Sequence, residues 1–262
     1  MKKLLITSIV VLAAGITVFA FRIPLQDALE NAIKEPVPEP VGFENLDMNK
    51  TPEILEDTNA AEGVNTAPEA VTPATLNLDV PFTSQAPFAK WDEIHEDTCE
   101  EAAILMVHRF YENQPFTGPQ DADDELLAMV DWQNEHFGDF KSTNAEDTAR
   151  IAREFYGYEN VDVIYDITID DIKREVAQGR PVVLLAAGRL LGNPNFTGEG
   201  PLYHALVVKG WTETEIITND PGTRKGHDYR YAPDVLMNAV GDWNNGDPAN
   251  GRTVMLVVHP ST

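Results

Sequence analysis

Cys99 is the only cysteine of this 262-residue chain, and it stands where a helix is predicted to begin, in residues 97–106 (DTCEEAAILM). Far downstream, His204 opens an apolar segment, and Asp220 follows soon after it. A thiol, an imidazole and an acid are the reacting groups of a hydrolase with a cysteine nucleophile. The thiolate attacks, the imidazole takes its proton, and the third group orients the imidazole. The three residues therefore predict nucleophilic chemistry at Cys99.

The position of Cys99 in its helix bears on the reactivity of the thiol. If Asp97 or Thr98 caps the helix, Cys99 falls in the first turn, where free backbone N–H groups and the helix dipole favour an anion. This position predicts a lowered pKa for the thiol. Glu100 and Glu101 would raise that pKa if they faced the sulfur, but helical geometry predicts that both side chains fan outward. The alternative is a small buried hydrophobic residue without a chemical role.

A hairpin connects the candidate histidine with its acid. Residues 204–208 and 215–220 are predicted to be strands joined by a turn, so that position 204 comes back beside positions 220–222. An even pairing sum puts His204 and Asp220 on the same face of the sheet, whereas an odd sum favours Asn219. Either side chain could orient an imidazole, Asp220 through its charge and Asn219 through a neutral hydrogen bond.

Gln85 is the candidate oxyanion donor. It lies before Cys99 on a loop that prolines bound on both sides, in residues 81–87 (PFTSQAP). An amide on this loop could reach over the helix start and join the backbone N–H of Cys99 in stabilising a tetrahedral oxyanion. A loop glutamine by itself is uninformative, so this prediction depends on the other three residues.

The elements that must position these residues change type along the chain. Apolar residues at three- and four-residue spacing predict helices in the first part, and short apolar runs predict strands in the second. Helices first and an antiparallel sheet later is the pattern of an α+β fold. The predicted helices are 97–111, 124–137, 145–156, 168–179 and 233–240, and the predicted strands are 76–80, 161–165, 181–187, 203–211, 215–219, 228–231 and 253–259.

The motifs around these residues resemble those of the bacteriocin-processing cysteine peptidases, the double-glycine leader peptidase family, which has a papain-like fold. The resemblance implies that Cys99 is the nucleophile and His204 the general base. It also implies that Asp220 is the orienting acid and Gln85 the oxyanion donor. It covers residues 76–260 and rests on the segments 80–87 (VPFTSQAP), 91–92 (WD), Cys99, 203–210 (YHALVVKG) and 219–221 (NDP).

Two features depart from that family. Many relatives carry Cys-Gly-Pro at the nucleophile, where this chain has Cys99, Glu100 and Glu101. No transporter segments or ATPase motifs follow the peptidase-like part, so the context of leader-peptide export is missing. These departures leave the substrate open.

The fold that the resemblance implies is an α+β, papain-like cysteine peptidase fold. It has N-terminal helices, the nucleophile at a helix N-terminus and an antiparallel sheet packed against these helices.

The N-terminus predicts export. Lys2 and Lys3 precede an apolar run at residues 4–21, and residues 18–20 (VFA) fit a signal-peptide cleavage site. The run is also long enough to span a membrane if it stays uncut. Residues 1–21 are therefore predicted to be a signal peptide or an N-terminal membrane anchor, which puts the protein outside the cytoplasm, secreted or anchored.

The rest of the chain divides into two parts. Residues 22–75 are rich in proline and acidic side chains, and they are predicted to be a linker, with a propeptide as the alternative. Residues 76–262 are predicted to form the papain-like cysteine peptidase-like domain. One cysteine excludes an internal disulfide.

Composition limits the partners and the cofactors. The formal net charge of −24 repels phosphate backbones, so nucleic acid is not an expected partner, and membrane contact is expected only through the N-terminal segment. The acidic cluster at residues 121–125 lacks the glycine and the register of a calcium loop. There is no zinc-type His/Glu pair or cysteine pair, and no glycine-rich phosphate loop. No metal or cofactor is therefore predicted.

These observations together predict an exported cysteine peptidase that hydrolyses peptide bonds through a Cys-His-Asp triad and a thioester intermediate. Its expected partner is a peptide or protein substrate, and its oligomeric state is not predicted. One alternative is a cell-wall amidase or acyltransferase with the same triad. The other is a non-catalytic peptide-binding domain on the same fold.

Overall fold

The computed structural model describes residues 35–46 and 73–260. The chain divides after Pro36, and the larger unit, Val37–Thr262, holds the helices and strands given below. The predicted signal peptide or anchor, and residues 22–34 and 47–72 of the predicted linker, lie outside the described residues. No helix within the described ranges is long and apolar enough to cross a membrane.

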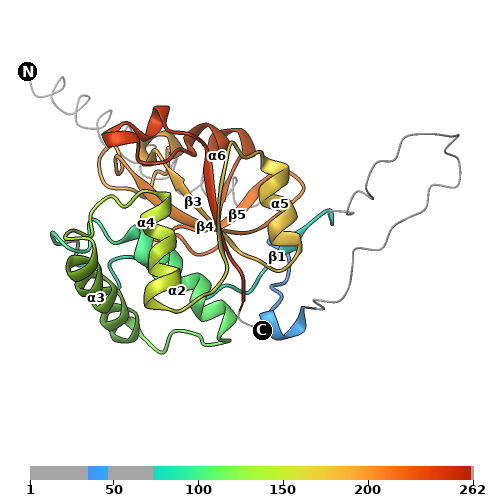
Figure 1. Cartoon of the computed structure of the whole chain (residues 1–262). Coiled ribbons are helices and arrows are strands. Elements are labelled where there is room, and N and C mark those ends of the chain that lie inside the picture. The colour runs from blue at the N-terminus through green and yellow to red at the C-terminus, as the bar shows by residue number, and fades with distance from the viewer. Residues whose placement is uncertain (1–34, 47–72, 261–262) are drawn as a thin grey trace, which may run out of the picture. The chain divides into compact units, whose positions relative to one another are not determined.

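A seven-stranded antiparallel sheet forms the centre of the larger unit (Figure 1). Its strands follow the order β2-β7-β3-β4-β5-β6, and β1 pairs with the end of β4. The middle strands β3, β4 and β7 are buried along their whole length, as expected for apolar runs covered on both faces. The bounds are β1 (Leu76–Asn77), β2 (Val161–Tyr165), β3 (Val182–Ala186), β4 (His204–Trp211), β5 (Ile216–Asn219), β6 (Tyr229–Tyr231) and β7 (Val254–Val258).

The α-helices of the described residues precede or connect these strands. Helices α2, α3 and α4 gather into one group, and α5 lies apart from them (Figure 1). Thr168 starts α5 with a capping box, in which its hydroxyl and the carboxylate of Asp171 each bond the other's backbone N–H. The bounds are α2 (Cys99–Tyr111), α3 (Pro119–His136), α4 (Ala145–Arg150) with a π-helical continuation (Ile151–Phe155), α5 (Ile169–Ala177) and α6 (Pro233–Ala239).

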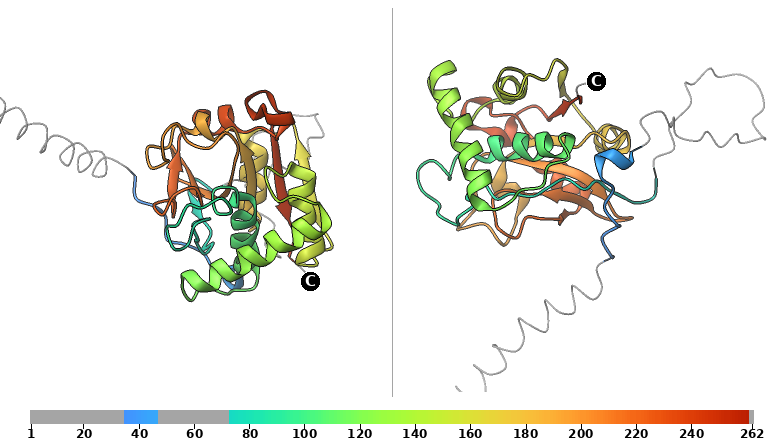
Figure 2. Two further views of the ribbon diagram at one scale, coloured as in Figure 1. Left: turned by 90° about the vertical axis from the view of Figure 1, so that its left-hand side faces the viewer. Right: turned by 90° about the horizontal axis from the view of Figure 1, so that it is seen from below.

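Helix α2 is covered on nearly every side. It packs against β3 and β4 and is covered in turn by α3 and α4 (Figure 2). Of its 13 residues, 11 are buried. A helix that is enclosed in this way has no solvent-facing side on which charged residues of its first turn could lie.

Part of the segment predicted as a linker packs within the larger unit. Val41 forms a parallel bridge with Leu78, supported by a hydrogen bond from the Val41 N–H to the Asn77 carbonyl at 2.8 Å. The ring of Phe43 makes edge contacts with Phe110 and Tyr111 at the end of α2, with centroids 5.6 and 5.1 Å apart. The predicted boundaries between linker and domain stay a prediction.

The α+β architecture expected from the sequence is confirmed. The largest differences concern one helix and one strand. Helix α3 begins at Pro119 rather than at residue 124, because proline suits the first turn of a helix. The strand expected at 76–80 pairs as β1 only at Leu76–Asn77, and Leu78 turns to the bridge with Val41.

Candidate active site

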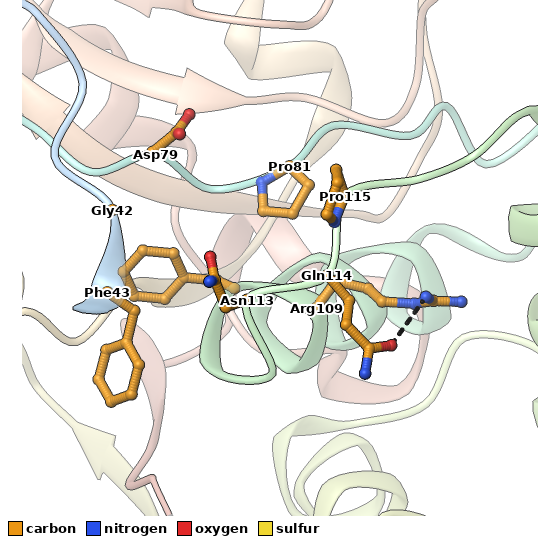
Figure 3. Close-up of a pocket in the computed structure, with 9 residues that line it drawn as sticks. Gly42, Phe43, Asp79, Pro81, Arg109, Asn113, Gln114 and Pro115 are labelled. Atoms are coloured by element: carbon orange, nitrogen blue, oxygen red, sulfur yellow. Dashed lines mark hydrogen bonds between the residues drawn. The ribbon is translucent and has the colours of Figure 1, made fainter. Parts of the chain in front are cut away.

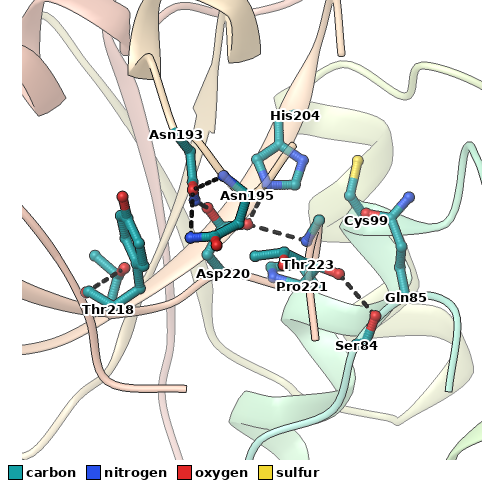
Figure 4. Close-up of polar contacts among 12 residues, drawn as sticks. Ser84, Gln85, Cys99, Asn193, Asn195, His204, Thr218, Asp220, Pro221 and Thr223 are labelled. Atoms are coloured by element: carbon teal, nitrogen blue, oxygen red, sulfur yellow. Dashed lines mark hydrogen bonds and ion pairs between the residues drawn. The ribbon is translucent and has the colours of Figure 1, made fainter. Parts of the chain in front are cut away.

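Three segments that are far apart in the sequence meet at the start of α2 (Figure 4). The hydroxyl of Thr98 donates to the carbonyl of Gln85 at 3.2 Å, which ties the loop before the helix to its N-cap. The N–H of Gln85 and the hydroxyl of Ser84 both donate to the carbonyl of Pro221, at 3.0 and 3.2 Å. The four residues singled out from the sequence, Gln85, Cys99, His204 and Asp220, are thereby brought into one place.

The hairpin of β4 and β5 places Asp220 beside His204. Val207 pairs with Asn219 and Val208 with Thr218, and the sum of each pair is even. His204 and Asp220 therefore share a face, and Nε2 of His204 lies 2.8 Å from Oδ1 of Asp220. Asn219, the alternative left open by the sequence, points elsewhere and donates from Nδ2 to the carbonyl of Val80 at 2.9 Å.

Asp220 is fully buried and is surrounded by donors. Besides the contact with His204, its Oδ1 accepts the N–H of Gly222 at 3.0 Å. Its Oδ2 accepts Nδ2 of Asn193 at 3.0 Å and the hydroxyl of Tyr231 at 2.5 Å. Burial alone would raise the pKa of Asp220, but His204 and these hydrogen bonds outweigh it and hold the pKa below its usual value. The carboxylate is therefore ionised.

Neither Asn193 nor Tyr231 was predicted as a site residue. Asn193 lies in the segment before His204 and Tyr231 lies on β6, and no local motif marks either residue. Both reach Asp220 through tertiary structure, across the sheet edge formed by β5 and β6.

The hydrogen bond to Asp220 determines which nitrogen of His204 is free. Because an ionised carboxylate only accepts, Nε2 of His204 carries a proton and donates it. Nδ1 is buried and has no hydrogen-bond partner. In Figure 4 the ring lies between Asp220 and the sulfur of Cys99. Phe196 contacts the ring edge-on with centroids 5.3 Å apart, and Gly222 leaves no room for a side chain against it.

Cys99 is the first residue of α2 and is 5% exposed. Its thiol donates to Oε2 of Glu100 at 2.9 Å. Burial raises the pKa of Cys99 well above its usual value, the charge of Glu100 and the hydrogen bond to it raise it further, and the N–H of Ala205 lowers it only in part. The predicted lowering of this pKa is wrong.

The predicted outward orientation of Glu100 and Glu101 is also wrong. Glu100 is 1% exposed and bonds to the sulfur, and Glu101 is fully buried and accepts Nε2 of Gln133 on α3. The reason is the enclosure of α2 between the sheet and α3 and α4, which leaves its first turn no side that faces water.

Gln85 is buried close to Cys99, but its amide has other contacts. Nε2 donates to the carbonyls of His95 and Glu96 at 2.9 and 3.1 Å, and Oε1 is buried without a partner. Both hydrogens of the amide are therefore directed at the loop that precedes α2. To donate to an oxyanion, the amide must release or share one of them.

The acidic cluster at residues 121–125 makes structural ion pairs. Asp121 and Glu125 both contact the guanidinium of Arg109, and Asp123 contacts Nε2 of His95 at 2.9 Å. Within residues 35–46 and 73–260, no group of three or more histidine, cysteine, aspartate or glutamate side chains could hold a metal ion.

Figure 3 shows residues that line a cavity of about 220 Å³. It is lined by Gly42, Phe43, Asp79 and Pro81, and by residues from the end of α2 onward, including Arg109 and Asn113. With a rise of about 1.5 Å per residue, Arg109 is roughly 15 Å along the helix from Cys99. The cavity is therefore not part of the candidate active site.

A family model and a solved structure are similar to this chain. Residues 77–247 match the Peptidase_C39 like family. Among solved structures, a Bacillus anthracis protein provisionally assigned as a C39-like peptidase is 16% identical with a TM-score of 0.46. That match covers 70% of this chain and 96% of the other chain. No curated protein matches this chain.

Proposed function

Because this chain belongs to the Peptidase_C39 like family, we propose that it is a cysteine peptidase that hydrolyses peptide bonds with Cys99 as the nucleophile. His204 is the general base and Asp220 the residue that orients it. One observation carries the assignment: Nδ1 of His204 is buried without a partner beside Cys99, while Nε2 is held by Asp220 at 2.8 Å. A neutral imidazole in this tautomer has its basic nitrogen on the side of the thiol.

The proposed reaction follows from these positions. Nδ1 of His204 takes the proton of the Cys99 thiol, and the sulfur attacks the peptide carbonyl to form a tetrahedral intermediate. The imidazolium then gives its proton to the leaving amine, and a thioester remains on Cys99. Water, deprotonated by the same nitrogen, attacks the thioester and releases the acid. Asp220 stays ionised throughout and stabilises the imidazolium.

The negative oxygen of the intermediate needs hydrogen-bond donors. The backbone N–H of Cys99 lies in the first turn of α2, where N–H groups have no acceptor within the helix. Gln85 is the second proposed donor. Since its amide donates to the carbonyls of His95 and Glu96, we expect substrate binding to turn one of its hydrogens toward the oxyanion.

The substrate proposed is a peptide or protein outside the cytoplasm. The sequence of residues 1–21 supports export, because a basic start precedes an apolar run. The charge of −24 supports peptide rather than nucleic acid as the substrate.

The test uses the single thiol. In the full chain, Cys99→Ala is expected to abolish hydrolysis of a fluorogenic peptide library while the circular dichroism spectrum stays unchanged. His204→Ala is expected to lower the rate of Cys99 alkylation by iodoacetamide. A Cys99→Ala protein that cleaves peptides as fast as the wild type contradicts the proposal. An alkylation rate indifferent to His204 would instead indicate a peptide-binding domain without catalysis.

A further inference from the structure

The residue after the nucleophile makes the closest polar contact of the thiol. Oε2 of Glu100 accepts the Sγ–H hydrogen of Cys99 at 2.9 Å. The side chain of Glu100 is 1% exposed, and its second oxygen, Oε1, is buried without a partner. The reaction proposed above does not use this carboxylate.

The thiol has two possible acceptors, and it donates to the one that opposes its ionisation. Nδ1 of His204 is unpartnered, while the hydrogen of Cys99 is directed to Glu100. An ionised carboxylate beside the sulfur disfavours a thiolate, because two like charges would then lie together in a buried site. The same carboxyl group in its neutral form would donate a hydrogen bond to the thiolate and favour it.

The groups around Glu100 decide when it carries its charge. It is faced by Cys99 and Glu101 on α2, by Asp97 before the helix, and by Tyr203 and His204 at and just before the start of β4. Burial raises the pKa of Glu100, and Asp97 raises it further. The hydrogen bond with Cys99, a backbone N–H and the charge of His204 lower it in part, so that the pKa lies at about 7. Glu100 therefore changes charge in the neutral range.

We propose that Glu100 is the positioning residue that controls the protonation of the nucleophile, and this rests on the proposed function. When Glu100 is ionised, Cys99 keeps its proton and the site is at rest. When Glu100 is neutral, its O–H donates to the sulfur. The S–H bond then breaks, the proton moves to Nδ1 of His204, and a thiolate–imidazolium pair forms. The reactive state thus lies on the acidic side of neutrality.

Glu101 supplies a matched control. It is the next residue and is equally buried, but it contacts Gln133 rather than the sulfur. Burial raises the pKa of Glu101 well above its usual value, and the neighbouring Glu100 raises it further. Glu101→Gln changes a buried carboxyl group that does not contact the sulfur, whereas Glu100→Gln changes the one that does.

The experiment is the pH dependence of Cys99 alkylation by iodoacetamide in the full chain. In the wild type, the rate is expected to fall as the pH rises through about 7, and to rise again only when the thiol itself ionises. The alkylation rate of Glu100→Gln is not expected to fall as the pH rises through about 7. At about pH 8, one unit above the pKa of Glu100, this variant should react at least about tenfold faster than the wild type. Glu101→Gln should keep the wild-type profile.

The outcomes separate this inference from the proposed function. A wild-type alkylation rate that does not fall as the pH rises through about 7 overturns the inference. This measurement does not depend on the folding of any variant. A Glu100→Gln protein that reacts more slowly than the wild type also overturns it, because Glu100 would then be the proton acceptor. If His204→Ala leaves every rate unchanged, the proposed function itself fails. If only His204→Ala changes the rate, the proposed function stands and the role of Glu100 does not.

Discussion

Two acids contact the candidate catalytic pair, and their surroundings set their charges in opposite ways. Asp220 accepts hydrogen bonds on both oxygens, which keep its pKa low although it is fully buried. Glu100 accepts a bond from Cys99, its Oε1 has no partner, and burial dominates its pKa. Two carboxyl groups of one site thus supply one negative charge that persists through the neutral range and one that depends on pH there.

Tyr231→Phe tests how its hydrogen bonds keep Asp220 ionised. The change removes the hydroxyl that bonds Asp220 at 2.5 Å and keeps the ring. A lost hydrogen bond to a charged group is expected to cost about 2 kcal/mol of stability, and the pKa of Asp220 should rise toward its usual value. Since the folded pKa is the lower one, ionised Asp220 stabilises the fold above about pH 4, and this stability is lost as the pH falls.

Acid unfolding followed by circular dichroism measures the effect. Tyr231→Phe is expected to unfold at a higher pH than the wild type. Tyr229→Phe is the control, because Tyr229 packs on the ring of Tyr231 but leaves the hydroxyl bonded to Asp220 in place. An acid transition in Tyr231→Phe that coincides with the wild type would contradict this account of Asp220.

At the scale of elements, one extra residue decides which side chain meets His204. Near the turn, Trp211 pairs with Ile216 and Gly210 with Ile217, and both sums are odd. Beyond Lys209 the sums are even. The register therefore changes at a β-bulge, and without it the face of His204 would carry Asn219 instead of Asp220.

The bulge explains what the sequence could and could not predict. Period-two patterns and turn residues correctly predicted strands at 203–211 and 215–219, and hence that His204 meets residue 219 or 220. The choice between them depends on Lys209, whose side chain is buried at 1% exposure against Asp228 at 2.7 Å. Asp228 follows β5 in the sequence, so no local pattern around Lys209 predicts this contact.

The first turn of α2 shows the same limit. Its start after Thr98 was predictable from capping residues and apolar spacing. The orientation of Glu100 and Glu101 was not, because it depends on the covering of α2 by α3 and α4. Contacts between distant segments thus set the charge environment of the thiol, whereas local patterns set where the thiol lies.

Asp228→Asn tests whether this ion pair stabilises the bulge. The ammonium of Lys209 would stay buried without its counter-charge. We expect a loss of about 2 kcal/mol, below the value for a fully buried pair because Asp228 is partly exposed. Asparagine tolerates the positive φ of 50° at this position, so the substitution adds no backbone strain.

Urea unfolding measures the change in stability of Asp228→Asn. Asp234→Asn, at an exposed carboxylate on α6, should change stability little. An equal loss of stability in both variants would contradict the claim that the ion pair with Lys209 stabilises the bulge.

At the scale of the whole described unit, the two ends of α2 have separate roles. The start carries Cys99 and its contacts with Glu100 and β4. The end carries Phe110 and Tyr111, on which Phe43 of the N-terminal segment packs. At about 1.5 Å per residue, the first and the last of its 13 residues lie roughly 18 Å apart. The docked part of the segment therefore does not cover the candidate active site, and we expect it to act on stability alone.

Phe43→Ala tests this separation. The change removes the aromatic contacts with Phe110 and Tyr111, and since Phe43 is half-buried we expect a loss of about 2 kcal/mol in urea unfolding. The rate and pH profile of Cys99 alkylation should stay those of the wild type, because nothing at the start of α2 changes. Val37→Ala is the control, since Val37 lies on the same segment but is exposed. If Phe43→Ala altered the alkylation profile at unchanged stability, the segment would act on the nucleophile through α2, as an inhibitory propeptide would, and its role would be regulatory rather than structural.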